Sequence, residues 1–352
     1  MTHPALRTPL CDLLGCRYPI VQTGMGFVSD ATLTSATSGA GGFGILGGVT
    51  MDLHQLREAI KETRERTDQP FGVNLRADQP DIRDRIDLLA QEDVRVASFA
   101  MAPNKDVVGR LHDGGVLVIP SIGAKRHAEK VAALDVDAVL VQGAEGGGHT
   151  GPVSTTLLLP QVVDTVDVPV IAAGGFFDGR GLVAALAYGA EGVAMGTRFV
   201  LTAESPVPES VKRFYLSKSV TDTVVSTQVD GVPHRVLRTP FVEELERGGR
   251  IRTLSRAARN ALAFRKLSGT SWREIVGEGL AMRKRHGLTW SQVMMAANTP
   301  MLLRRAMVEG DPSAGVMASG QVVGVIDDIP TVADLIGRIV SEAEATLKGL
   351  TT

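Results

Sequence analysis

The chain has 352 residues, 44% of them hydrophobic, and its 37 basic side chains nearly balance 39 acidic ones, for a net charge of −2. A chain of this size and apolar content can bury a full core, which excludes disorder and a minimal disulfide scaffold. The near-neutral charge excludes a dedicated nucleic-acid binder, which would carry a basic excess over the whole domain. Glycine is abundant, with 39 residues, about 11% of the chain against roughly 7% in an average protein.

The chain has two cysteines, Cys11 and Cys16. No second Cys or Cys/His pair completes a zinc set, so we predict no metal site and two ordinary thiols in a reducing compartment. The amino terminus has no basic stretch leading into an apolar core, and every apolar run falls short of the ~18 residues of a membrane span. We therefore expect a cytoplasmic protein without a membrane or nucleic-acid partner.

Short apolar runs rich in Val, Ile and Ala recur along the first two hundred residues, with helical patterns between them. They begin near Ile20, Gly44, Phe71, Val94, Val116, Ala138, Val168 and Gly192. Strands this apolar, without regular alternation, are typical of a parallel sheet covered on both faces. The helical patterns include residues 51–66, 82–92, 124–134 and 180–188. Together they predict an α/β fold of the (β/α)8 TIM barrel type, with an open doubly wound sheet as the alternative.

After the eighth strand the pattern becomes mostly helical. We expect a barrel over residues 1–204, a smaller helical substrate or lid domain over 205–310, and a segment over 311–352 that returns to the barrel. From Arg247 to Arg285 the helical region carries eleven Lys and Arg but two acids, a local excess of +9. This excess is either a solvated helix face or a landing surface for the phosphates of a nucleotide or coenzyme A.

Glycines concentrate where strands of the predicted barrel end, which is where barrels place their active sites. Gly174 and Gly175 follow the seventh strand, and Gly196 and Thr197 follow the eighth. Glycine lets backbone N–H groups approach an anion without obstruction by a Cβ atom. Two such pairs on adjacent strands predict a phosphate site, although two tight turns would also need glycine.

Several polar side chains lie in or near these strand ends. His149, in the glycine-rich stretch QGAEGGGHTG, has no apolar face to fill and is suited to moving a proton at neutral pH. Glu145 would orient that imidazole or its loop, unless it faces solvent, and it is also a candidate to contact substrate. His234 could enter the site from the second domain to contact substrate. Asn74 and Gln142 could read the edge of a heterocycle, or act as strand-end caps.

Residues 42–47 match the dinucleotide fingerprint G-x-G-x-x-G. That fingerprint must follow a strand and open a helix, whereas here the glycines follow a predicted helix at 32–38 and lead into a strand. We therefore reject a dinucleotide site at this position.

Six motifs in order carry a resemblance to a known family. They are QTGMGFVSD, AGGFGILGG, PFGVNL, QGAEGGGHTG, VPVIAAGGFFDGRG and EGVAMGTRFVLTAES. The combination resembles the nitronate monooxygenase (2-nitropropane dioxygenase) family, which also includes flavin-dependent enoyl-thioester reductases. The likeness runs from about residue 8 to 205 and resumes at GQVVGVIDDIP, so it covers the helical insert poorly.

The resemblance implies a barrel that binds FMN, and it implies a role for each matching residue. Gly24, Met25 and Gly26 would lie along the flavin ring, and Asn74 and Gln142 would contact ring or ribityl groups. Gly174, Gly175, Gly196 and Thr197 would hold the phosphate, and His149 matches the catalytic histidine of the family.

Two departures from the family pattern favour reductases over monooxygenases. Thr23-Gly24-Met25 replaces a proline-methionine-glycine turn, and the stretch from Ile119 to Ile122 lacks the lysine that many monooxygenases carry. The nearest subgroup resembled is that of actinobacterial flavin reductases acting on coenzyme A thioesters of steroid-ring fragments.

Three functions follow as hypotheses. The first is NAD(P)H-dependent reduction of an unsaturated acyl-CoA thioester, with His149 as the acid or base. The second is a nitronate monooxygenase that oxidises alkyl nitronates with O2, and the third is a non-catalytic flavoprotein that binds an acyl-CoA. The sequence leaves the substrate and the choice of NADH or NADPH open, and the apolar run VMMAA, at 293–297, suggests a homodimer.

Overall fold

The computed structural model describes residues 3–247 and 299–351. The chain divides into two compact units. The first comprises residues 1–146, 150–206 and 325–352, and the second comprises residues 147–149 and 207–324. All but the first residue of the basic segment 247–285, and the whole VMMAA run, lie outside the described residues.

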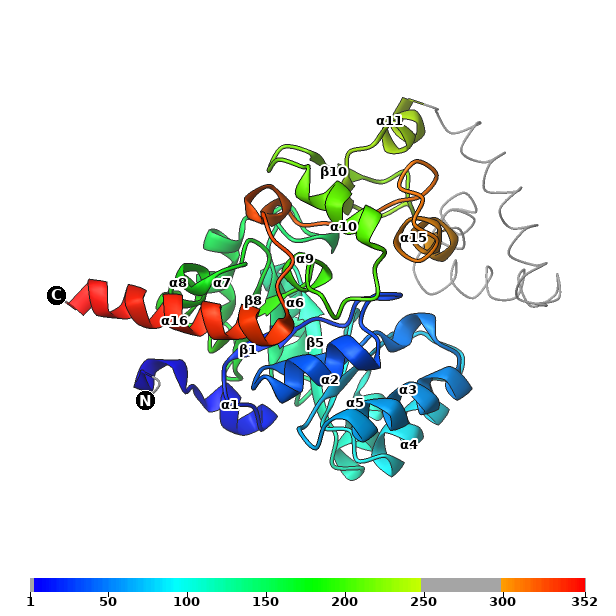
Figure 1. Ribbon diagram of the computed structural model, residues 1–352. Coiled ribbons are helices and arrows are strands. Elements are labelled where there is room, and N and C mark those ends of the chain that lie inside the picture. The colour runs from blue at the N-terminus through cyan, green and yellow to red at the C-terminus, as the bar shows by residue number, and fades with distance from the viewer. Residues whose placement is uncertain (1–2, 248–298, 352) are drawn as a thin grey trace. The chain divides into compact units, whose positions relative to one another are not determined.

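The first unit is built on a closed barrel of eight parallel strands (Figure 1). These are β1 (Ile20–Gln22), β2 (Phe43–Leu46), β3 (Gly72–Leu75), β4 (Val96–Phe99), β5 (Leu117–Ile122), β6 (Val139–Gln142), β8 (Val170–Ala173) and β9 (Gly192–Met195). Closure comes from the parallel pairing of β1 with β9, in which Val21 lies opposite Ala194. The predicted TIM barrel is confirmed, and all eight strands begin within two residues of their expected starts.

Helices surround this barrel in the first unit. They are α1 (Pro9–Leu14), α2 (Ala31–Gly39), α3 (Leu53–Arg66), α4 (Ile82–Gln91), α5 (Lys105–Asp113), α6 (Lys125–Ala132), α7 (Thr155–Val163), α8 (Gly179–Ala187), α9 (Thr197–Val200) and α16 (Val332–Thr351), with short 3-10 turns at η1 (Pro4–Leu6) and η2 (Gly48–Thr50). Their starts follow local capping chemistry. Asp52 and Gln55 form a reciprocal capping box at the start of α3, and Asp178 caps α8 by accepting from the N–H of Gly181.

One apolar cluster of the first unit joins the barrel strands to α1. Inward-facing side chains fill the barrel, and the amino-terminal helix α1 packs against them; the cluster includes Leu10, Leu14, Val21, Phe43, Ile45, Val96, Ile119, Leu140, Ile171 and Ala194. Both cysteines are free thiols, and Cys11 is buried. The strands are buried on both faces, by the barrel interior on one side and by the surrounding helices on the other, which is why their short apolar runs lack alternation.

The carboxyl-terminal segment packs on the barrel through α16, which contacts α8 and α2 (Figure 1). The guanidinium of Arg198, whose side chain is only 3% exposed, reaches Asp328 at 2.9 Å. Arg338 of α16 contacts the same carboxylate at 2.6 Å. These contacts join the tail to α9, which follows β9.

The second unit contains a three-stranded antiparallel sheet in the order β10-β11-β7. Its strands are β7 (Gly148–His149), β10 (Thr223–Ser226) and β11 (His234–Leu237), and its described helices are α10 (Glu209–Leu216), α11 (Pro240–Arg247) and α15 (Thr299–Met307); the 3-10 turn η3 (Gln321–Val325) spans the boundary with the tail. These strands carry no clear signal in the sequence, because they are partly exposed and mix polar with apolar residues, unlike the continuously buried barrel strands. Val229, Val236, Val242, Leu245, Leu302 and Val316 form the apolar cluster beside them.

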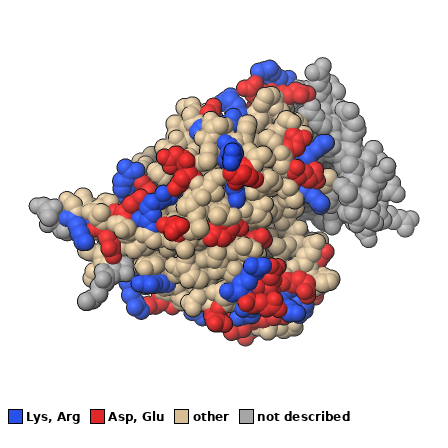
Figure 2. Space-filling view, in the orientation of Figure 1, with Lys and Arg blue, Asp and Glu red and all other residues tan. Residues whose placement is uncertain are grey.

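Charges of both signs are interleaved over the surface in the view of Figure 2, notably over α3, α4 and α5 at the lower right. Exposed ion pairs link neighbouring helices there, including Arg110 to Asp87 at 2.7 Å and Arg57 to Glu92 at 3.3 Å. Pairs of this kind contribute little to stability, about 0–1 kcal/mol each. Over residues 3–247 and 299–351, none of the helices combines the length and the hydrophobicity that a membrane crossing needs.

Candidate active site

The predicted cofactor residues of the first unit lie at the carboxyl ends of barrel strands. Gly24 to Gly26 follow β1, Asn74 is the third residue of β3, and Gln142 ends β6. Gly174 and Gly175 follow β8, and Gly196 follows β9. The carboxyl ends of parallel strands share one face of a barrel, so residues scattered over more than 170 positions gather at one end.

The turn after β1 is held by a buried glutamine. The side chain of Gln22 donates to Ser29 Oγ at 2.8 Å, and Ser29 Oγ accepts from the backbone N–H of Met25 at 2.9 Å. A Cβ atom on Gly24 would lie 2.2 Å from Cβ of Asn74, so only glycine allows these two strand ends to approach. The turn and Asn74 therefore form one continuous surface.

The loops after β8 and β9 contain the glycines that are predicted to hold a phosphate, and we call these two loops the glycine cradle. Gly174 and Gly175 have φ angles of +87° and +90°, a left-handed conformation that favours glycine. β8 and β9 pair in parallel, so the two loops are neighbours. A Cβ atom on Gly196 would lie 3.4 Å from the sulfur of Met25, which connects the cradle to the β1 turn. The loops after the seventh and eighth strands are where barrels commonly bind phosphate.

Glu145 and Thr155 form hydrogen bonds that support the loop of Gly174. The carboxylate of Glu145 accepts from the N–H of Thr155 at 3.0 Å and lies 2.7 Å from its hydroxyl. The same hydroxyl is 2.9 Å from the carbonyl oxygen of Gly174. Glu145 thus caps the start of α7 and supports the glycine loop, while its contact with substrate stays a prediction.

The two amide side chains lie at the rim of the barrel. Asn74 donates to the carbonyl of Ser98 at 3.3 Å. The side chain of Gln142 lies against Gly146, where a Cβ atom would approach its amide nitrogen to 2.7 Å. Amide side chains can read the edge of a heterocycle, and this role stays a prediction for both residues.

His149 belongs to the second unit, where it lies on β7 directly opposite His234 of β11. Its side chain is 61% exposed, whereas that of His234 is 5% exposed. His149 Nε2 is 2.6 Å from Oδ2 of Asp230, and His234 Nδ1 is 3.2 Å from the same oxygen. The structure therefore brings the two predicted histidines together around one carboxylate.

Asp230 is not among the site residues that the sequence predicts. Burial by itself would raise the pKa of this carboxyl, but hydrogen bonds from His149 and His234 hold the pKa well below its usual range. Asp230 is therefore ionised at neutral pH. The signal in the sequence was the turn DGVPH, which sets an aspartate four residues before a histidine, but its relation to His149 depends on the pairing of β11 with β7.

The ligand atoms of His149, Asp230 and His234 lie within 4.8 Å of one another, close enough in principle for a divalent cation. Both histidines, however, direct a ring nitrogen to the carboxylate at hydrogen-bond distance. These hydrogen bonds explain the close approach of the three side chains without a metal ion. The absence of a metal site stays a prediction.

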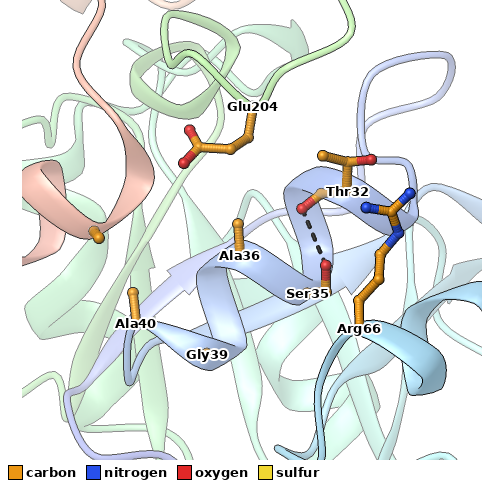
Figure 3. A pocket seen from close by; sticks show the side chains of 8 residues that line it. Thr32, Ser35, Ala36, Gly39, Ala40, Arg66 and Glu204 are labelled. Carbon is orange, nitrogen blue, oxygen red and sulfur yellow. Dashed lines mark hydrogen bonds between the residues drawn. The ribbon is translucent and has the colours of Figure 1, made fainter.

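A separate hollow of about 540 Å3 lies outside the barrel (Figure 3). It is lined by small side chains of α2 and of the residue that follows it, among them Ala36 and Ala40, together with Arg66 and Glu204. Glu204 accepts from the N–H of Val332 at 2.9 Å and so caps α16. The hollow contains none of the predicted site residues.

The sequence matches the nitronate monooxygenase family over residues 7–92 and 82–342. It is 59% identical over 338 residues, 96% of both chains, to the (3aS,4S,5R,7aS)-5-hydroxy-7a-methyl-1-oxo-octahydro-1H-indene-4-carboxyl-CoA dehydrogenase of Rhodococcus jostii RHA1. It is also 59% identical over 341 residues, again 96% of both chains, to the protein of the same name from Mycobacterium tuberculosis H37Rv.

Among solved structures, FabK from Thermotoga maritima is similar, with a TM-score of 0.80, 36% identity and 98% coverage of both chains. The family match covers nearly the whole chain, including the insert that the motifs left unassigned. The protein is thus an oxidoreductase and belongs to the nitronate monooxygenase family.

Proposed function

We propose that the protein is an FMN-dependent dehydrogenase of a coenzyme A thioester that carries a hydroxylated, fused-ring steroid fragment, with His149 as the acid or base. The observation that carries this proposal is the 59% identity, over 96% of both chains, to two proteins named as dehydrogenases of such a thioester. The sequence motifs favour reduction of an unsaturated thioester with NAD(P)H. The names of the two relatives favour oxidation of a hydroxylated thioester instead.

The first unit offers a cradle that fits FMN. Gly175 leaves space for a phosphate, because its Cβ position has no atom closer than 3.8 Å, whereas Gly174 packs against the backbone of Gly143 and Gly146. Gly24 and Gly26 let the turn after β1 pack closely against the side chains of Asn74 and Thr50. Met25 lies in this turn, and Asn74 and Gln142 provide amide groups for a ring edge. Gly196 and Thr197 complete the phosphate loop. When bound, FMN supplies a two-electron acceptor for the substrate.

His149 supports the proton transfer that must accompany loss of two electrons. Oxidation of a ring hydroxyl to a carbonyl removes a hydride from carbon and a proton from oxygen. An imidazole near neutral pH is matched to accepting that proton, and typical contributions of such a group are 10²–10⁴-fold in rate. The ionised Asp230 at 2.6 Å stabilises the imidazolium that results.

An anaerobic mixing experiment tests the proposal. The FMN-loaded protein is mixed under nitrogen with the hydroxylated indene-carboxyl-CoA thioester, and the flavin absorbance is followed. We expect stoichiometric bleaching of the oxidised flavin by the thioester. The matched control is the corresponding thioester without the ring hydroxyl, which should leave the flavin oxidised. In separate arms, NADH and NADPH show whether a reductive reaction also occurs.

Nitronate monooxygenase activity is the second candidate, favoured by the family match itself. Here His149 would stabilise the anionic nitronate, and O2 would be consumed. Oxygen uptake with propyl-2-nitronate, without any flavin bleaching by the thioester, would select this activity and overturn the dehydrogenase proposal.

A further inference from the structure

The loop after β9 continues directly into α9, a helix of four residues. Inside this turn, the N–H groups of Phe199 and Val200 donate to the carbonyl oxygen of Gly196 at 2.9 Å and 3.0 Å. A single helical turn is unstable on its own, because it fixes several residues in exchange for few hydrogen bonds. The conformation of Gly196 and Thr197, the proposed phosphate residues of this loop, therefore depends on contacts from outside the turn.

Arg198, the second residue of α9, supplies such contacts through a side chain that is only 3% exposed. Its Nη2 donates to the carbonyl oxygen of Leu201, the residue that caps the end of α9, at 2.7 Å. The same nitrogen donates to the carbonyl oxygen of Asp328 at 2.9 Å, and Nη1 donates to Oδ1 of Asp328 at 2.9 Å. One guanidinium thus closes the carboxyl end of α9 and joins it to the tail.

Arg338 of α16 binds the same carboxylate from the surface. Its Nη1 donates to Oδ2 of Asp328 at 2.6 Å, and its side chain is 43% exposed. Asp328 would therefore keep an ionic partner in the absence of Arg198. Burial and the contact with Leu201 at the end of α9 distinguish Arg198 from this exposed arginine.

The buried position of the Arg198 guanidinium is costly. Burial lowers the pKa of Arg198, and the carboxylate of Asp328 opposes this effect. Buried ion pairs add little net stability, because the loss of hydration offsets the attraction between the charges. Fixing one conformation of the chain is the better-attested use of such a pair, and α9 is a segment that needs fixing.

The loop of Gly196 also packs against the turn after β1. A Cβ atom on Gly196 would lie 3.2 Å from Oγ1 of Thr23 and 3.4 Å from the sulfur of Met25. The loop therefore has two supports, the β1 turn and, through Arg198, the tail. Donor groups that are fixed before a ligand arrives bind it more tightly, because less conformational entropy is lost on binding.

We propose that Arg198 is a positioning residue for the cofactor phosphate, which it serves by joining the end of α9 to Asp328 and so fixing Gly196 and Thr197. The inference rests on the proposed FMN site. It makes the preference of that site for a phosphorylated flavin depend on the attachment of the tail, through a side chain that acts on the loop and not on the phosphate.

The first test compares two flavins that differ in the phosphate. FMN and riboflavin are titrated into the apoproteins of the unmodified chain, R198M and R338M, and the dissociation constants are measured by quenching of flavin fluorescence. We expect R198M to weaken FMN binding at least about tenfold, as for the loss of one hydrogen bond from a charged group, and to leave riboflavin binding unchanged. R338M removes the exposed partner of the same carboxylate and should bind FMN normally.

The second test measures the loop without any flavin. Amide hydrogen exchange is followed in the full-length apoproteins, in peptides that cover residues 196–202. We expect faster exchange at Phe199 and Val200 in R198M and the unmodified rate in R338M, because Arg198 alone of the two arginines contacts Leu201 among the described residues. If R198M does not fold, R198K serves in both tests, because one ammonium cannot replace the fork of a guanidinium, and the changes should have the same direction.

Equal losses of FMN and riboflavin affinity in R198M would make Arg198 a general structural residue and would overturn the inference. Unchanged exchange in α9, or a loss of FMN affinity in R338M as large as in R198M, would overturn it as well. Failure of the proposed FMN site looks different, because the unmodified protein would then bind FMN no more tightly than riboflavin. That result overturns both proposals, whereas an unmodified preference for FMN that persists in R198M overturns the role of Arg198 alone.

Discussion

At the scale of single residues, the proposed chemistry depends on proton transfer by His149. It belongs to the second unit, whereas the glycine cradle belongs to the first. Replacing the imidazole should therefore separate catalysis from cofactor binding. The ionised carboxylate of Asp230, held by two histidines, keeps a fixed negative charge beside the ring.

We expect H149A to retain FMN and to lose at least about 10²-fold in kcat, the lower end of the general acid–base contribution. FMN content is measured by absorbance of the purified protein and kcat by anaerobic turnover. H54A, a change at an exposed histidine on α3, is the control and should keep full activity. Unchanged turnover in H149A would support the non-catalytic flavoprotein that the sequence left as a third hypothesis.

The sequence could identify His149 and His234 because each is an unusual residue in its local context, one between glycines and one after a turn. It could not identify Asp230, because Asp230 lies 81 residues from His149 and meets it through strand pairing. It also could not reveal that Glu145 is engaged with Thr155, since that contact depends on how the loop folds onto α7.

At the scale of elements, the glycine loops turn strand ends into a cradle. A Cβ atom on Gly175 would impose strain through its φ of +90° and would enter the space that the phosphate needs. Gly115 offers a matched control, because its φ is +75° and no atom lies within 4 Å of its Cβ position. The two glycines therefore share the backbone strain but not the proposed contact.

We expect G175A to weaken FMN binding at least about tenfold, which corresponds to about 1.4 kcal/mol. The dissociation constant is measured by quenching of flavin fluorescence on titration into the apoprotein. G115A should lose similar stability, since both carry the same kind of strain, yet bind FMN normally. Equal affinities in the two variants would place the phosphate elsewhere.

The attachment of the tail adds a pH dependence to stability. Arg338, and then Arg198, hold the pKa of Asp328 below its ordinary value. A carboxyl with a lowered pKa in the folded state stabilises the fold above its unfolded pKa, and this contribution is lost as pH falls through the folded pKa. The side chain of Asp328 is 36% exposed, so solvent screening reduces the effect.

We expect the free energy of unfolding of D328N to be lower than that of the unmodified protein at neutral pH. The difference should shrink below about pH 4, the ordinary pKa of an aspartate. Urea unfolding at a series of pH values measures it. D84N, at an exposed position of α4, should show no such convergence. A constant gap for D328N at all pH values would mean that its charge is not the cause.

At the scale of the whole molecule, the barrel could be predicted from sequence and the second unit only in part. Eight buried parallel strands leave apolar runs at regular spacing, a signal that survives without any alignment. The strands of the second unit are partly exposed and mix polar with apolar residues, so they leave no such apolar runs. Its strand β7 also comes from residues 147–149, between two segments of the barrel unit.

Removal of the cofactor should lower the free energy of unfolding of the whole molecule, because a ligand that binds only the folded state stabilises that state. FMN at about 100 times its dissociation constant would add about 2.7 kcal/mol. We expect apoprotein to unfold at a lower temperature than holoprotein, and re-addition of FMN to restore the difference in proportion to the logarithm of its concentration. Scanning calorimetry measures this, and riboflavin, which lacks the phosphate, is the control and should restore less.

The most direct test of the central claim is an anaerobic titration of the FMN-loaded protein with the hydroxylated indene-carboxyl-CoA thioester. We expect the oxidised flavin spectrum to bleach with one equivalent of thioester and to lose that response in H149A. No bleaching by the thioester, together with oxygen consumption on propyl-2-nitronate, would contradict the account.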